Sequence, residues 1–130
     1  MSAERDFRHP LQRARGLGAA KSGTGHWWWQ RVTAAALVLL VPWMIGLLVS
    51  MVGMNALEMR DAIGRPWNAI LLALLVIMLF WHSRLGVQVV IEDYVHARGV
   101  EITLQVLNTL ACALGALASL YAIGRIALGA

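Results

Sequence analysis

Three long apolar blocks constrain the fold of this chain more than any other feature of its sequence. They cover residues 32–52, 67–91 and 102–127, and charged side chains are nearly absent from them. Each block reaches the roughly 20 residues with which an α-helix crosses a hydrocarbon core about 30 Å thick. Because lipid offers no partners to an irregular backbone, each block is expected to be one continuous helix. The sequence therefore predicts an all-α membrane protein with three transmembrane helices.

The charges outside these blocks predict how the chain is organised. We expect a tail at residues 1–26 and a three-helix membrane anchor at residues 27–130, with helices at about 27–53, 66–93 and 101–127. Most of the net charge of +4 comes from arginines in the tail, so it indicates membrane topology and not binding to nucleic acid. The positive-inside rule places the N-terminus and the loop after the second helix in the cytoplasm. Because Glu4 and Asp6 argue against a mitochondrial presequence, we expect a bacterial inner membrane.

The second block carries the most distinctive polar pattern of the chain. One helical face of this block carries four residues at steps of four, three and four positions: His82, Gly86, Val89 and Asp93. Eleven residues of helix advance about 16 Å, so a histidine near the bilayer midplane lies beneath Asp93 and Tyr94 at the membrane surface. Ionisable groups inside a membrane are costly, and each one is therefore a functional candidate.

Two interpretations are open for His82. It is either a neutral histidine that hydrogen-bonds a neighbouring helix or an axial ligand to haem iron. Gly86 favours the haem, because a glycine one turn away leaves space for a flat macrocycle. No other histidine lies within the three blocks, so a second histidine ligand would have to come from another polypeptide. Cys112 is the only cysteine, which argues against a cysteine-based metal cluster in this chain.

Three residues near the predicted cytoplasmic surface also have two interpretations each. Asp93 and Tyr94 either end the helix and anchor it among the headgroups, or they serve a lipid quinone. In the second case the phenol donates to a quinone carbonyl and the carboxylate relays protons. Arg31 either reaches up to a lipid phosphate or pairs with a haem propionate.

Arg84 predicts a contact outside a simple three-helix bundle. It lies about 200° around the helix from His82, so the two side chains cannot both face one internal seam. We therefore expect one of them to meet a partner chain, a cofactor or the membrane interface.

Other residues predict packing and not chemistry. Pro42 is expected to kink the first helix. In the third block small residues recur every four positions and predict close helix contact, and they are Ala111, Gly115 and Ser119. A headgroup-level aromatic belt is expected at Trp27, Trp28 and Trp29.

The motifs resemble one known family. The segment from His82 to His96, with Gly86 and Asp93-Tyr94 at their spacing, looks like the second helix of the small hydrophobic (D-type) anchor subunit of succinate dehydrogenase. The string Gly25-His-Trp-Trp-Trp-Gln-Arg-Val-Thr-Ala34 is similar to the entry of that family's first helix, where Arg-x-Thr-Ala recurs.

The resemblance implies a subunit of succinate:ubiquinone oxidoreductase without a dehydrogenase active site of its own. The three helices would be half of a haem-binding bundle, completed by a second, C-type anchor subunit. His82 would be one axial ligand of haem b, and Arg31 would contact a propionate. Tyr94 would hydrogen-bond ubiquinone, with Asp93 in the proton path. The two anchors would dock an iron–sulfur subunit and an FAD flavoprotein.

Two alternatives remain open from the sequence. The chain could be a haem-free subunit of a small transporter in which His82 and Arg84 form a polar relay. The odd number of spans and the lack of an internal repeat count against it. It could also be a purely structural anchor that recruits soluble partners.

Overall fold

The structure is a computed structural model that describes residues 23–129. It contains four α-helices: α2 (Gly23–Ser50), α3 (Ala56–Gly64), α4 (Pro66–Tyr94) and α5 (Arg98–Ala127). Three of them, α2, α4 and α5, are long and apolar enough to cross a membrane. At 28, 29 and 30 residues these helices are each about 42–45 Å long. The expectation of an all-helical chain with three candidate membrane spans is confirmed.

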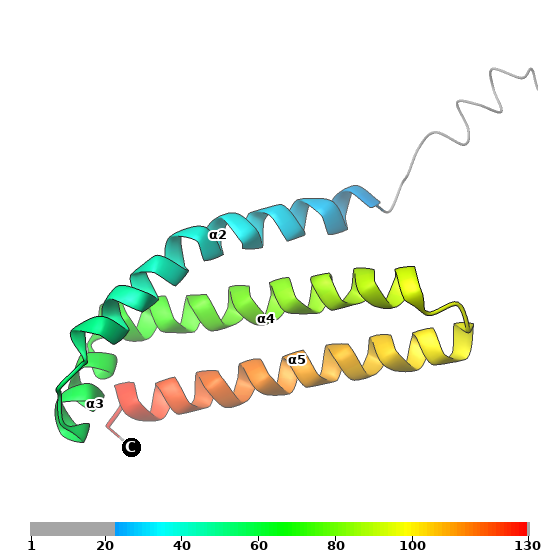
Figure 1. The fold of residues 1–130 in the computed structure, drawn as a ribbon. Helices are drawn as coiled ribbons and strands as arrows, with labels where there is room; N and C mark the ends of the chain where they lie inside the picture. The colour runs from blue at the N-terminus through cyan, green and yellow to red at the C-terminus, as the bar shows by residue number, and fades with distance from the viewer. Residues whose placement is uncertain (1–22, 130) are drawn as a thin grey trace, which may run out of the picture.

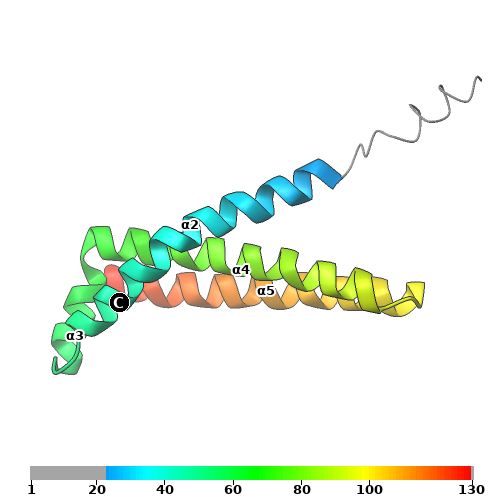
Figure 2. The same cartoon turned by 45° about the horizontal axis from the view of Figure 1, so that its top comes forward.

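The three long helices form an open row and not a closed bundle. In Figure 1, α4 lies between α2 and α5, and α2 crosses it obliquely in the rotated view of Figure 2. Within residues 23–129, α4 contacts both neighbours, whereas α2 and α5 do not contact each other. The row therefore has two separate seams, one on each side of α4. We call its two ends the Tyr94 end, where α2 begins, α4 ends and α5 begins, and the Ser50 end.

The short helix α3 was not among the helices predicted from the sequence. It begins with a capping box, in which the Asn55 side chain accepts from the Glu58 backbone N–H and the Glu58 carboxylate accepts from the Asn55 N–H, both at 2.9 Å. This pairing satisfies two backbone groups that a helix start otherwise leaves open. The polar spacing Asn55–Glu58 was the available signal, but the charges around it indicated a loop.

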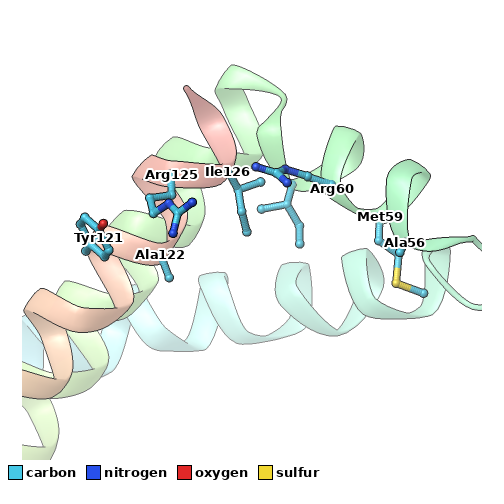
Figure 3. A pocket seen from close by; sticks show the side chains of 8 residues that line it. Ala56, Met59, Arg60, Tyr121, Ala122, Arg125 and Ile126 are labelled. Carbon is cyan, nitrogen blue, oxygen red and sulfur yellow. The ribbon is translucent and has the colours of Figure 1, made fainter. Parts of the chain in front are cut away.

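At the Ser50 end, α3 packs against α4 and α5. A hollow of about 550 Å³ lies between α3 and the last turns of α5, and Figure 3 shows side chains of both helices around it, among them Arg60 and Tyr121. This hollow lies at the opposite end of the row from Asp93 and Tyr94. It is therefore separate from every site that the sequence predicted.

The predicted tail, residues 1–26, lies outside the described residues up to position 22. Residues 23–26 already belong to α2, so this helix begins four positions before the predicted span. Pro42 lies inside α2, and the helix axis bends along its length in Figure 1. A proline removes one backbone hydrogen bond and pushes on the preceding turn, which is the usual cause of such a bend.

The α4–α5 seam is the tighter of the two. A Cβ atom added at Gly115 would lie 2.5 Å from Cε1 of Phe80, closer than real side chains approach. Gly115 therefore lets the α5 backbone come against the aromatic ring, as the small-residue pattern predicts. Ser119, one turn further on, satisfies its hydroxyl by donating to the Gly115 carbonyl oxygen at 2.8 Å.

Candidate functional site

The α2–α4 seam is organised around one buried hydroxyl. Thr33 is 0% exposed, the lowest value in the described chain. Its Oγ1 donates to the carbonyl oxygens of Trp29 at 2.8 Å and Gln30 at 3.1 Å. The same oxygen lies 3.0 Å from Nδ1 of His82 on α4. The imidazole of His82, which the sequence predicted as an iron ligand, is therefore held by a side-chain hydrogen bond between α2 and α4.

A hollow opens one turn above His82, toward the Tyr94 end. It measures about 500 Å³ and its lining includes Gly86 and Val89 of α4 and His26, Gln30 and Arg31 of α2. The position of Gly86 decides its shape, because a Cβ there would have only one neighbour within 4 Å, Nε2 of Gln30 at 3.8 Å. The absent side chain thus leaves room and does not relieve a clash, as the sequence predicted for this glycine.

Two polar atoms beside this hollow have no partner. Nε2 of His26 and Oε1 of Gln30 are buried and make no hydrogen bond with any described residue. Leaving a buried polar atom unpaired costs about 1–3 kcal/mol, so such atoms call for a ligand or a partner chain. The hollow therefore fits a group with polar edges that enters between α2 and α4.

Arg31 lies at the rim of the same hollow. Its guanidinium carbon sits 4.5 Å from the centre of the Trp27 ring, in a cation–π contact. The ring has no hydrogen-bond acceptor of its own on this face, so the guanidinium N–H groups are available for an anion. Both interpretations of Arg31, a lipid phosphate or a cofactor carboxylate, are compatible with this position.

The aromatic belt is only partly present. Trp27 and Trp28 are more than half exposed. Trp29 instead stacks on Trp81 of α4, with ring centres 5.0 Å apart and planes at 26°. This contact covers the seam next to His82 and gives Trp29 a packing role that the sequence pattern did not indicate.

Asp93 and Tyr94 occupy the last turn of α4, and both are exposed. Tyr94 is 80% exposed, and within residues 23–129 neither side chain makes a hydrogen bond or an ion pair. Because α4 is helical without interruption from Pro66 to Tyr94, the predicted spacing from His82 is realised. The structure thus brings His82, Gly86 and Arg31 to one seam and leaves the Asp93–Tyr94 pair at its outer edge.

The sequence led us to expect that His82 or Arg84 meets a partner chain, a cofactor or the membrane interface, and the premise of that expectation was wrong. It assumed one internal seam, whereas α4 has two. His82 faces α2, and Arg84 faces α5, where its Nε donates to Thr109 Oγ1 at 3.1 Å. The Asn108 amide also donates to the Arg84 carbonyl oxygen at 3.0 Å. The two directions on the helix were predicted correctly, but each meets a helix of the same chain.

The polar partners of the two central residues were not identified from the sequence. Thr33 stood inside the motif Arg-x-Thr-Ala without a role, and Thr109 lay in a helix to which no chemistry was assigned. Their signal was present, since each is a hydroxyl inside an apolar block. A pattern along one helix does not show which residue of another helix lies opposite, so the pairs came only from the structure.

The fold and the seam define the class first: a multi-pass membrane protein with three apolar helices and polar side chains held between them. Comparison with known proteins then gives the family. Residues 5–122 match the family described as succinate dehydrogenase/fumarate reductase transmembrane subunit, and the chain belongs to it. It is a membrane anchor subunit of such a complex, which confirms the resemblance seen in the sequence.

Individual relatives agree. The succinate dehydrogenase hydrophobic membrane anchor subunit of Rickettsia bellii is 38% identical over 99 residues, 76% of this chain and 79% of the relative. The protein of the same name from Paracoccus denitrificans is 33% identical over 123 residues, 93% of each chain. The succinate dehydrogenase membrane anchor subunit of Reclinomonas americana is 32% identical over 85 residues, 63% of this chain and 71% of the relative. No solved structure gives a significant match.

Proposed function

We propose that this anchor subunit holds haem b in its α2–α4 seam, with His82 as one axial ligand, and contributes Tyr94 to a ubiquinone site at the Tyr94 end. In this role it takes part in electron transfer from succinate to ubiquinone. A second anchor subunit supplies the other axial ligand, and both anchors dock the iron–sulfur and FAD subunits. The single observation that carries the proposal is the hydrogen bond between Thr33 and His82.

That bond determines which nitrogen of His82 can bind a metal. The Thr33 hydroxyl has one proton, and it is directed to the backbone carbonyls of α2. With that proton on a carbonyl, the hydroxyl oxygen accepts from His82 and the imidazole proton is on Nδ1. Nε2 is then left with its lone pair, the form in which histidine ligates a metal. A second partner that fixes the ring and its tautomer is the usual arrangement around metal-binding histidines.

The hollow beside Gly86 supports the same proposal. A haem held by His82 and reaching into this hollow would supply a one-electron carrier between the soluble subunits and the membrane. Gly86 leaves a flat surface for the ring, and Arg31 offers a guanidinium to a propionate. The open face of the row beside His82 is where a second anchor subunit would close the bundle.

The quinone assignment depends on Tyr94 and Asp93. The exposed phenol at the end of α4 can donate a hydrogen bond to a quinone carbonyl at the membrane edge. The neighbouring carboxylate can pass protons from water to a quinone as it is reduced. The sequence charges favour a cytoplasmic location for this end in a bacterial inner membrane.

The test is the absorption spectrum of the purified complex. We expect a dithionite-reduced b-type haem band in the wild-type complex and at least a tenfold smaller band in His82→Leu, because the axial bond is lost. His96→Leu is the matched control, since His96 is an exposed histidine just beyond α4. An assembled His82→Leu complex with an unchanged haem band would refute the assignment.

A further inference from the structure

Arg84 is a charged residue of the α4–α5 seam that leaves most of its hydrogen-bond donors unused. An arginine side chain has five N–H donors, and only Nε–H is used here, toward Thr109. The four donors on the two terminal nitrogens find no acceptor among residues 23–129. A guanidinium in this condition is suited to an anion with two oxygens, which it can bind through parallel hydrogen bonds.

No carboxylate of the described chain can supply that anion. Arg84 lies ten residues before Tyr94, or about 15 Å along α4. Glu92 is eight residues further on, about 12 Å away along the axis. Glu92 accepts hydrogen bonds from Gln88 at 2.8 Å and from Gln105 at 3.4 Å, so it is engaged at the surface. Glu101 lies just as far from Thr109 along α5.

The groove on either side of Arg84 changes in polarity. Toward the Tyr94 end, a hollow of about 290 Å³ has a mixed lining, in which Gln88 and Gln105 are polar and Val106 and Leu110 are apolar. Toward the bilayer centre, a second hollow of about 300 Å³ is almost wholly apolar and includes Phe80. Arg84 lines both hollows and lies where they meet. The groove is thus more polar above the cation than below it.

We propose that the α4–α5 groove binds an anionic phospholipid of the leaflet at the Tyr94 end. The phosphate oxygens accept from the terminal N–H groups of Arg84, and Gln88 and Gln105 line the path of the headgroup. One acyl chain lies along Phe80 and Ala113 toward the bilayer centre. A lipid of this leaflet has its headgroup toward the Tyr94 end and its acyl chains toward the bilayer centre, which matches the more polar and the more apolar hollow of the groove. The positive charge of Arg84 selects an anionic headgroup.

A lipid fits this groove better than a partner helix with a carboxylate. The His82 seam lies on the opposite side of α4, and the second anchor subunit is expected there. This choice of occupant rests on the proposed function, whereas the anion-binding character of Arg84 does not.

The experiment uses the complete purified complex in nanodiscs of phosphatidylcholine, alone or mixed with phosphatidylglycerol. Phosphatidylglycerol that stays bound after transfer to detergent is counted by native mass spectrometry. We expect roughly tenfold weaker retention in Arg84→Gln, since a charge-assisted pair is lost and 1.4 kcal/mol corresponds to tenfold. Arg84→Lys should lie between the two, because lysine keeps the charge without the fork. Arg98→Gln, at an exposed position at the start of α5, is the matched control.

Three outcomes overturn the proposal. Equal loss in Arg84→Gln and Arg98→Gln would mean general attraction of anionic lipid to a basic surface. Loss of a partner subunit from Arg84→Gln, with lipid retention unchanged, would assign Arg84 to a carboxylate of that partner. Equal retention of both lipids by the wild-type complex would show that the groove does not select an anion, and this measurement needs no variant. Failure of the haem test on His82 would leave the lipid measurement unaffected.

Discussion

The two sides of α4 hold a polar residue in similar ways but are built differently. On the α2 side, His82 pairs with a threonine that is fully buried, and an open hollow follows one turn above it. On the α5 side, Arg84 also pairs with a threonine, two smaller hollows lie on either side of it, and the helices approach closely where Gly115 meets Phe80. A neutral imidazole keeps a lone pair for a metal, whereas a guanidinium offers only N–H donors. This difference is the basis for the two proposals, a cofactor on the α2 side and an anion on the α5 side.

The glycines make the same distinction. A Cβ atom at Gly86 would meet one amide nitrogen at 3.8 Å, while a Cβ at Gly115 would overlap the Phe80 ring. One glycine keeps a space open, and the other lets two helices approach. A glycine within a transmembrane helix therefore indicates close contact or a binding space, and the neighbouring helix decides between them.

The largest effect is expected on haem retention, when the two threonines are replaced one at a time. We expect Thr33→Val to weaken haem retention roughly 10–100-fold, because His82 loses the partner that orients its ring. Thr109→Val removes the equivalent hydroxyl beside Arg84 and should leave haem content unchanged. Haem content per complex and the midpoint potential are the measurements.

Thr33→Ser is the conservative control, since it restores the hydroxyl, and it should recover the wild-type potential. If Thr33→Val and Thr109→Val lowered haem content equally, the two seams would not differ as described.

The second prediction compares the glycines in resistance to unfolding. Overpacking a core contact costs about 1–3 kcal/mol. We therefore expect the free energy of unfolding of Gly115→Ala to lie about 1–3 kcal/mol below that of Gly86→Ala, with helix propensity cancelling between them. Unfolding in mixed detergent, followed by circular dichroism, measures the difference.

Gly124→Ala serves as the control within α5, because a Cβ there has no neighbour within 4 Å. Equal values for Gly115→Ala and Gly124→Ala would show that the contact with Phe80 adapts without cost.

The third prediction concerns the outer end of the His82 face. Tyr94→Phe removes one hydrogen bond worth about 0.5–1.5 kcal/mol, so ubiquinone reduction should fall roughly 2–12-fold. Succinate oxidation with an artificial acceptor should persist, since it bypasses the quinone. Equal loss of both activities would point to an assembly defect.

The smallest effect is expected at the Ser50 end, away from both seams. Asn55→Ala removes the cap of α3 and should lower the unfolding free energy by about 1 kcal/mol. Haem content and quinone reduction should not change. A loss of haem in this variant would mean that α3 supports the distant α2–α4 seam.

Much of the architecture was predictable because membrane spans are governed by composition. Long apolar blocks at residues 67–91 and 102–127 correspond to α4 and α5, since any backbone in lipid must satisfy its own hydrogen bonds. The face that joins His82 and Gly86 was also predictable, because helix periodicity alone determines it. The helix α3 was missed because a capping box among charges resembles a polar loop until it packs on other helices.

The amino-acid pattern was enough to predict three helices that are long and apolar enough to span a membrane, and to place a histidine three turns before an acid and a phenol on one of them. It was enough because helix length and periodicity are local properties. The position of α4 in the middle of an open row came from the packing of the three helices. That arrangement gives His82 and Arg84 a threonine each from different helices. Contacts between helices depend on how side chains of distant segments pack, and no pattern along a single segment contains that information.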